Sequence, residues 1–225
     1  FVFGGDMESK ISVKNIAAIG MFAAMSFVAV LCGKVIPNVA NFLSYDPKDA
    51  VVAIAGFMFG PVAAVLIPIV VALVEMVSIS TTGPIGCLMN LISSACFACA
   101  AAFVYKKKHS ISGAVLGLVF GSVAMVAVML LWNWLITPLY MTGTSRSDVA
   151  AMLLPVFLPF NALKAGFNSA LTLMLYKPLV SALRKTGLIP KASSKSASAK
   201  WGIYLLGTAL LVTCILLLLV LRGIL

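Results

Sequence analysis

The sequence predicts an all-α integral membrane protein, in which a six-helix bundle is followed by one extra C-terminal transmembrane helix. Hydrophobic residues make up 62% of the chain and charged residues only 10%, whereas soluble domains average about 45–50% and about 25%. The mean hydropathy is +1.14. At roughly 20 apolar residues per span, 225 residues can hold about six or seven membrane helices. A soluble enzyme, a disordered chain and a small disulfide scaffold are therefore excluded.

Apolar runs separated by polar or Gly-Pro segments set the expected order of elements. The first run is span-length and continues into the fold, so we expect no cleavable signal peptide. The predicted spans cover 11–31, 50–59 (short, ending at Gly60-Pro61), 61–80, 87–105, 111–135, 149–179 (interrupted near its start by Pro155 and Pro159) and 201–221. The corresponding segments are an N-terminal cytoplasmic segment (1–10), the six-helix bundle (11–185), a Lys/Ser-rich linker (186–200) and the extra helix (201–225).

The basic residues predict the orientation of these spans. If the N-terminus is cytoplasmic, eleven of the sixteen Lys and Arg residues fall on the cytoplasmic side, as the positive-inside rule requires. The net charge of +10 is then explained by orientation in the bilayer, and no nucleic-acid partner is expected. The C-terminus, after the seventh span, is expected outside. The segments at 32–49, 81–86 and 141–148 would meet on the outer face.

Polar residues inside the spans are expensive in lipid and therefore suggest a functional site. Glu75 and Lys164 are ionisable residues within predicted spans. Asn161, Lys164 and Asn168 share one helix face by their spacing. These residues all fall in the outer half of the bilayer, together with Asn90, Asn133, Thr137 and Tyr140. They predict a pocket that opens outward, although hydrogen bonds between helices and snorkelling of Lys164 are alternative explanations.

Catalytic and metal-binding motifs are missing from the sequence. It contains no phosphate-binding loop, no G-x-S-x-G and no H-E-x-x-H. Cys96 and Cys99 form a C-x-x-C among small apolar residues, which is typical of membrane packing rather than redox or metal chemistry. The single histidine, His109, lies in a basic loop. We therefore expect no enzyme activity, no metal site and no cofactor.

Several segments together resemble the substrate-binding S components of energy-coupling factor (ECF) vitamin transporters, and most closely the riboflavin-specific branch. The matching segments are FLSYDPKDA (42–50), GFMFGP (56–61), TTGPIG with the asparagine at 90 (81–90), NWLITPLY (133–140) and PFNALKAGFNSALTLMLYKPL (159–179). The resemblance implies a six-helix protein of a prokaryotic cell membrane that captures one vitamin with high affinity at its outer face. It also implies partners: a transmembrane T subunit and two cytoplasmic ATPases.

The resemblance also implies roles for particular residues. Small residues of the first helix would contact the T subunit, here Gly20, Ala24 and Ala17. The loop over 34–48 would act as a lid, to which Tyr45 and Asp46 belong. By matched motif, the ligand contacts would be Asn90, Asn133, Tyr140, Asn161 and Lys164, to which Glu75 is added as the acidic residue inside a span.

Two departures from the family pattern keep alternatives open. The span at 201–221 has no counterpart in a six-helix protein, and Cys87 stands where a polar or acidic residue is expected. If position 87 contacts the ligand, the substrate could be a different small vitamin rather than riboflavin. Lys164 could pair with a phosphate, which keeps FMN open as a ligand. A stand-alone secondary transporter is a further alternative, although no internal repeat and no buried acid–base pair supports one.

Overall fold

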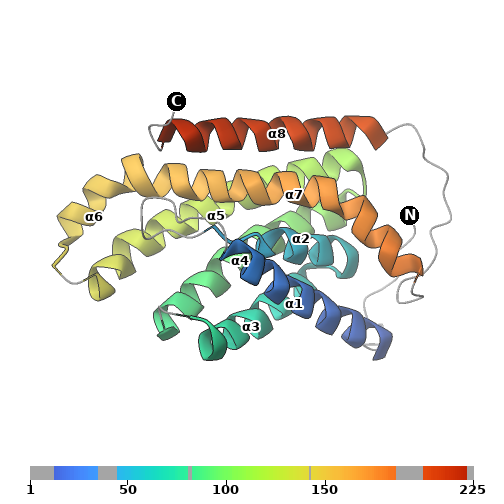
Figure 1. Cartoon of the computed structure of the whole chain (residues 1–225), viewed down its shortest axis with the longest axis horizontal. Coiled ribbons are helices and arrows are strands. Elements are labelled where there is room, and N and C mark those ends of the chain that lie inside the picture. Colours follow the sequence, from blue (N-terminus) through green and yellow to red (C-terminus); the bar gives the residue numbers. More distant parts are fainter. Residues whose placement is uncertain (1–12, 35–44, 81–82, 142, 186–199, 222–225) are drawn as a thin grey trace.

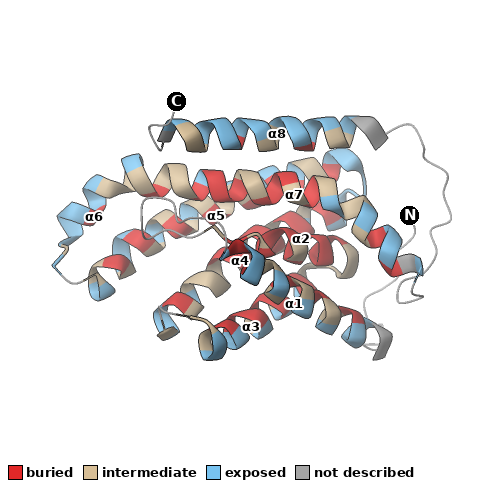
Figure 2. Cartoon of the chain, viewed as in Figure 1, coloured by how far each residue is buried: buried red, intermediate tan, exposed pale blue. Residues whose placement is uncertain are grey.

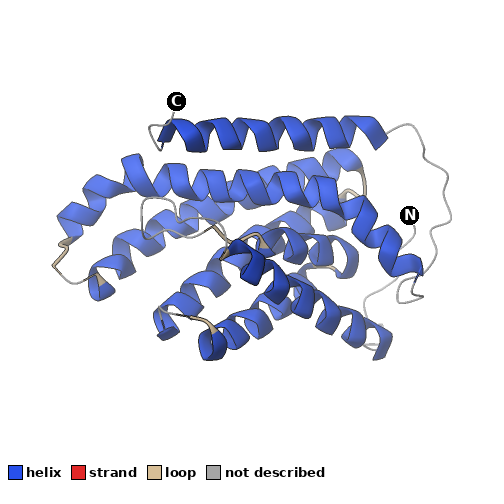
Figure 3. Ribbon diagram, viewed as in Figure 1, coloured by secondary structure: helices blue, strands red, loops and turns tan. Residues whose placement is uncertain are grey.

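The computed structural model describes residues 13–34, 45–80, 83–141, 143–185 and 200–221, and every regular element in these ranges is a helix (Figures 1 and 3). The predicted N-terminal segment, most of the 34–48 lid and most of the linker lie outside the described residues. The elements in chain order are α1 (Val13–Gly33), α2 (Lys48–Phe59), α3 (Pro61–Ser78), α4 (Gly83–Lys107), α5 (Ile111–Tyr140), α6 (Arg146–Met152), the π-helical turn η1 (Leu153–Phe157), α7 (Leu158–Lys185) and α8 (Lys200–Leu221).

Six helical segments in the described part of the chain are long and apolar enough to cross a membrane: Asn15–Gly33, Pro61–Ser78, Gly83–Lys107, Ile111–Tyr140, Arg146–Leu183 and Gly202–Val220. The last of them belongs to α8. Helix α2 is absent from this set because its 12 residues extend only about 18 Å at 1.5 Å per residue. The hydrocarbon core of a bilayer is about 30 Å thick.

Helix α2 instead forms the centre of the bundle. Nine of its twelve residues are buried, and it contacts α1, α3, α4 and α7. Figure 2 shows this burial as red over most of α2. Residues at the start of the helix, including Lys48 and Asp49, are as fully enclosed as the apolar residues that follow. The charged end of α2 is therefore placed inside the protein rather than in water.

Small residues allow the neighbouring helices to approach closely. A Cβ added at Gly117 would lie 2.6 Å from the carbonyl oxygen of Ala101, and one added at Gly121 would overlap the carbonyl oxygen of Phe97. Gly56 of α2 similarly meets Ala98 and Ala102 of α4. In lipid, where apolar side chains gain nothing by leaving the solvent, such close backbone packing is a main source of helix association.

The two prolines near the start of the predicted sixth span widen the helix rather than interrupt it. Pro155 lies within η1 and Pro159 is the second residue of α7. Ser145 begins this stretch with a capping box, in which its hydroxyl accepts from the amide of Asp148 and the Asp148 carboxylate accepts from the amide of Ser145. The chain thus remains helical from Arg146 to Lys185, and the π-helical turn absorbs the missing amide donors.

Candidate ligand-binding site

The first set of contacts in the site is centred on Lys48 and connects the loop before α2 to α3 and α4. The Lys48 side chain is fully buried, and its Nζ lies 2.5 Å from Oδ2 of Asp46 and 2.7 Å from Oε1 of Glu75. The second oxygen of Glu75 accepts a hydrogen bond of 3.1 Å from the Asn90 amide. Glu75 therefore has a partner on each oxygen, as a buried carboxylate requires.

The second set of contacts is centred on Lys164, which is 6% exposed, and connects α7 to α4 and α2. Its Nζ donates to Oγ of Ser93 at 3.2 Å and lies 3.5 Å from Oδ2 of Asp49. The other oxygen of Asp49 accepts a short hydrogen bond from the hydroxyl of Ser94. Asp49 is thus the point at which α2, α4 and α7 meet.

Asn168, one turn after Lys164 on α7, connects the two sets of contacts. Its side-chain amide donates to the backbone oxygen of Asp46 at 3.1 Å and to that of Lys164 at 3.0 Å. The hydroxyl of Tyr45 lies 3.5 Å from Oδ1 of Asn168, and its ring packs on Phe167 with the centroids 5.3 Å apart. We refer to these ten residues as the polar cluster: Tyr45, Asp46, Lys48, Asp49, Glu75, Asn90, Ser93, Ser94, Lys164 and Asn168.

The polar cluster has an excess of acidic groups. It contains three carboxylates (Asp46, Asp49 and Glu75) and two ammonium groups (Lys48 and Lys164). Burial alone would raise the pKa of Asp46, but the charges of Lys48 and then Lys164 outweigh burial and lower it below its usual value. Asp46 is therefore ionised at neutral pH. With every group charged, the cluster carries one net negative charge.

Tyr45 acts in the polar cluster as a neutral hydrogen-bond donor. Burial, followed by the negative charges of Asp49 and Asp46, raises the pKa of its hydroxyl far above the ordinary value. Its proton therefore stays in place at any physiological pH. Tyr45 and Asp46 hold the described end of the predicted lid against α7, whereas residues 35–44 lie outside the described part of the chain.

The remaining predicted ligand residues make their hydrogen bonds within their own helices. On α5, the hydroxyl of Thr137 donates to Oδ1 of Asn133 at 3.3 Å and lies 3.2 Å from the hydroxyl of Tyr140. On α7, the Asn161 amide donates to the backbone oxygen of Phe157 at 2.8 Å, at the end of the π-helical turn. Asn133 and Asn161 are buried, whereas Tyr140 is exposed. The polar cluster thus includes Tyr45, Asp46, Glu75, Asn90 and Lys164 but not Asn133, Tyr140 or Asn161.

The sequence-based prediction missed four members of the polar cluster. Lys48 and Asp49 directly precede an apolar run, which is the usual pattern of a helix end in water. Ser93 and Ser94 lie inside an apolar span, where hydroxyls often bond to their own backbone. The available signal was the position of the Lys-Asp pair next to an apolar run shorter than a full membrane span, because the rest of the protein has to enclose such a helix.

The small residues Ala17, Gly20 and Ala24 share an exposed face of α1. A Cβ added at Gly20 would meet nothing within 4 Å. These residues therefore do not serve packing within the described part of the chain. Within the same described part, no group of three or more His, Cys, Asp or Glu residues could hold a metal ion.

Comparison with known proteins identifies similar chains over most of the sequence. The family model for the substrate-specific component of ECF transporters matches residues 14–176. The riboflavin transporter RibU of Staphylococcus aureus (strain TCH60) is 28% identical over 177 residues, which cover 76% of this chain and 93% of the relative. The riboflavin transporter FmnP of Bacillus subtilis (strain 168) is 28% identical over 160 residues, covering 68% and 84%.

A solved structure gives the same picture of the fold. It is the S component of a bacterial ECF transporter and aligns with a TM-score of 0.63 and 28% sequence identity, covering 75% of this chain and 96% of that chain. The family match ends at residue 176, before α8 begins at Lys200. Helix α8 therefore lies beyond the family match.

Proposed function

This chain belongs to the family of substrate-specific components of ECF transporters, and from this premise we propose that it binds riboflavin with high affinity at the outer face of the membrane and delivers it inward. The family consists of transporter components rather than enzymes. The polar cluster is the observation that carries the proposal, because it brings Lys164, Asn90 and the described end of the lid together inside an apolar bundle.

The chemistry of the polar cluster favours riboflavin itself over FMN. Riboflavin is neutral, with a flat ring system and a hydroxylated tail that need apolar walls and a few hydrogen-bonding groups. Both lysines are already paired with carboxylates, and the cluster contains one carboxylate more than it has lysines. A phosphate dianion would therefore gain no unpaired cation here and would be repelled by the excess carboxylate.

We assign the ligand contacts to Lys164, Asn161, Asn133, Tyr140 and Asn90, with Tyr45 and Asp46 closing the site from the lid. Lys164 can donate to a ring carbonyl, and the asparagines can both donate and accept along the ring edge and the tail. Glu75 is assigned a supporting role, since Lys48 and Asn90 already occupy its two oxygens.

Loss of binding in two single variants tests this assignment. Lys164→Ala and Asn161→Ala should each raise the dissociation constant for riboflavin at least about tenfold, equivalent to about 1.4 kcal/mol. The readout is quenching of riboflavin fluorescence by the purified chain in detergent. Lys177→Ala, on the same helix, is the matched control and should bind as the wild type does. Unchanged affinity in both Lys164→Ala and Asn161→Ala, with thermal unfolding showing folded protein, would refute the site.

The energy for uptake is proposed to come from partners, namely a T subunit and two cytoplasmic ATPases, because the sequence has no phosphate-binding loop of its own. We propose the exposed Ala17, Gly20 and Ala24 of α1 as the face that meets the T subunit. Riboflavin uptake in cells should cease when the ATPases are removed. Uptake that continues without them, but collapses with the proton gradient, would favour a stand-alone secondary transporter.

The orientation is proposed from the basic residues of the sequence. Segment 1–10 and linker 186–200 are placed in the cytoplasm and the 11–185 bundle in a prokaryotic cell membrane. With the short α2 counted as the second span, enclosed by its neighbours, α8 is placed as a seventh span and the C-terminus lies outside. A reporter enzyme that is active only in the cytoplasm tests this topology. It should be active when fused after residue 190 and inactive when fused after residue 225.

A further inference from the structure

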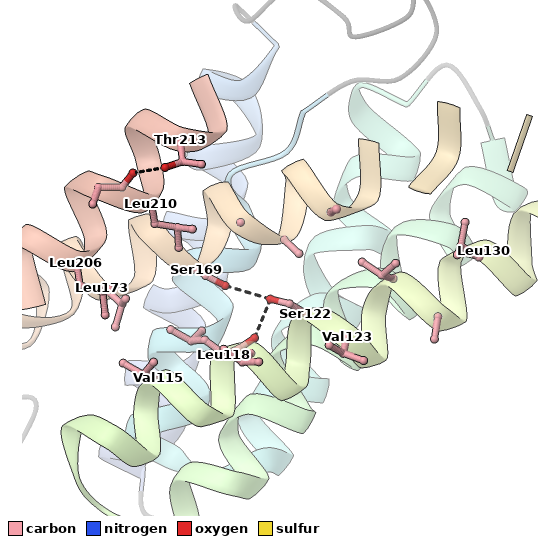
Figure 4. Close-up of a pocket in the computed structure, with 17 residues that line it drawn as sticks. Val115, Leu118, Ser122, Val123, Leu130, Ser169, Leu173, Leu206, Leu210 and Thr213 are labelled. Atoms are coloured by element: carbon pink, nitrogen blue, oxygen red, sulfur yellow. Dashed lines mark hydrogen bonds between the residues drawn. The ribbon is translucent and has the colours of Figure 1, made fainter. Parts of the chain in front are cut away.

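A groove of about 750 Å³ lies between α5, α7 and α8, away from the residues assigned to the vitamin (Figure 4). Its lining comes from one face of each helix: residues between Val115 and Leu130 on α5, residues between Leu206 and Thr213 on α8, and Ala162, Ala165, Gly166, Ser169 and Leu173 on α7. None of these lining residues belongs to the polar cluster, and all but three of the side chains are aliphatic or absent.

The three hydroxyls in the groove are already hydrogen-bonded within the protein. Ser122 and Ser169 lie 3.2 Å apart, and Ser122 also donates to the backbone oxygen of Leu118 at 2.7 Å. Thr213 donates to the backbone oxygen of Ala209 at 2.9 Å. A vitamin with several polar groups would find no free hydrogen-bond donor on this lining, so the groove suits a hydrocarbon occupant.

Close packing of α8 on α7 creates this groove, and Figure 1 shows the two helices side by side. A Cβ added at Gly166 would lie 2.7 Å from Sγ of Cys214, and one added at Gly207 would lie 2.9 Å from Cγ of Met174. Helix α8 is therefore seated directly on α7 and leaves its open side toward α5. Since α5, α7 and α8 are each apolar enough to cross a membrane, the groove faces lipid.

The size of the groove suits one lipid chain. Along α5, the lining from Val115 to Leu130 extends roughly 22 Å at 1.5 Å per residue. One leaflet contributes about half of the 30 Å hydrocarbon thickness, or about 15 Å. An acyl chain that entered from one membrane surface could therefore lie within the groove along its whole length.

One end of the groove is basic. Lys177 follows the lining residue Leu173 by one turn on the same face of α7. The exposed Lys106–Lys108 run ends where Lys108 packs against Gly113, two residues before the lining begins at Val115. Of the four acidic side chains in the described residues, three belong to the polar cluster and the fourth, Asp148, lies in α6. No described carboxylate therefore offsets this positive end.

We propose that the groove between α5, α7 and α8 binds an acyl chain of an anionic phospholipid, with its headgroup against Lys177 and the Lys106–Lys108 run. The apolar walls account for the chain, and the lysines account for the headgroup charge. Because α8 lies beyond the family match, this lipid site is a property of the extended chain rather than of the shared bundle.

The test measures lipid bound to the full-length chain after delipidation in mild detergent. Palmitoyl-oleoyl phosphatidylglycerol, or phosphatidylcholine with the same chains, is added back and bound lipid is counted by native mass spectrometry. We expect about one phosphatidylglycerol per chain, bound at least about fivefold more tightly than phosphatidylcholine, because each basic residue near a headgroup contributes about 1 kcal/mol.

Filling the groove should remove the lipid. Ala127 and Ala209 both line it and are exposed, so Ala127→Phe and Ala209→Phe should each weaken phosphatidylglycerol binding by about tenfold, as displacement of two methylenes predicts. Leu205→Phe, on the exposed face of α8 outside the lining, is the control and should bind as the wild type does. Lys177→Gln should lose about fivefold for phosphatidylglycerol and leave phosphatidylcholine unchanged.

The outcomes separate a lipid site from other occupants of the groove. Equal lipid retention by the wild type and both Phe variants would overturn the proposal, as would the absence of any retained phospholipid. A dimer that dissociates in Ala209→Phe would assign the groove to a second copy of the chain and would also overturn it. Circular dichroism of each variant shows whether it is folded. Because bound lipid is measured and riboflavin is not, the result does not depend on whether the chain binds riboflavin.

Discussion

Removal of the Lys48 charge provides a direct test of the polar cluster. In Lys48→Met, the apolar replacement has a similar length but leaves Asp46 and Glu75 without their shared cation. Lys48 is fully buried, and Nζ lies 2.5 Å and 2.7 Å from the two carboxylates. Water therefore cannot compensate for the lost charge. The cluster would change from three carboxylates and two ammonium groups to three carboxylates and one.

The expected cost follows from this loss of pairing. Removing one partner of a buried ion pair destabilises proteins by about 3–5 kcal/mol, because an uncompensated charge is left behind. Folded domains are stable by only about 5–15 kcal/mol in total. Lys48→Met should therefore lose about a fifth or more of the stability. The triple variant Lys48→Met, Asp46→Asn and Glu75→Gln should recover most of it, because no buried charge then lacks a partner.

The assay is reversible unfolding in mixed detergent micelles, followed by circular dichroism, with Lys177→Met as the matched control. Lys177 is half-exposed on α7, and its replacement should change the free energy of unfolding by less than about 0.5 kcal/mol. Two results would refute the reasoning. One is a Lys48→Met variant within about 1 kcal/mol of the wild type. The other is a triple variant no more stable than the single variant.

Three further predictions concern packing, docking and ligand charge. Gly121→Ala should destabilise the chain by about 1–3 kcal/mol, because the new methyl would overlap the carbonyl oxygen of Phe97; Gly20→Ala, in open space, should not destabilise it. Gly20→Leu and Ala24→Leu should leave riboflavin binding intact and abolish uptake in cells; lost binding would place them in the internal fold. FMN should bind at least about tenfold more weakly than riboflavin in the same fluorescence titration, and equal affinity would contradict the charge argument.

The positions of the long helices could be predicted, because the hydropathy of the sequence alone locates membrane-spanning segments. The expected third span at 61–80 is α3, which ends at Ser78, and the expected fifth span at 111–135 is α5, which continues to Tyr140. The observed helix ends differ from the predicted ones where a turn signal in the sequence lies inside the helix. Pro138 lies in the last turn of α5, and the helix continues past it for two residues. Likewise α4 begins at Gly83 rather than at 87, because proline is tolerated in a first turn.

The candidate site was harder to predict, because its partners come from distant parts of the chain. The depth of Glu75, Asn90 and Lys164 could be inferred from their positions in the spans. Their partners could not, since Lys48 and Asp49 reach them only because the twelve-residue α2 is enclosed by four other helices. Local periodicity carries no information on which helices surround a given turn.

The charge pattern of the polar cluster argues that it does more than stabilise the bundle. Five buried charges are a costly way to hold helices together, since apolar side chains of the same volume would often be as stable. The charged groups also connect separate elements of the fold. Asp49 connects α2 to Lys164, and Asn168 connects Lys164 to the loop at Asp46. A ligand that bonds to Lys164 therefore acts on the residues that hold the loop, and by reciprocity the loop affects how tightly that ligand is held.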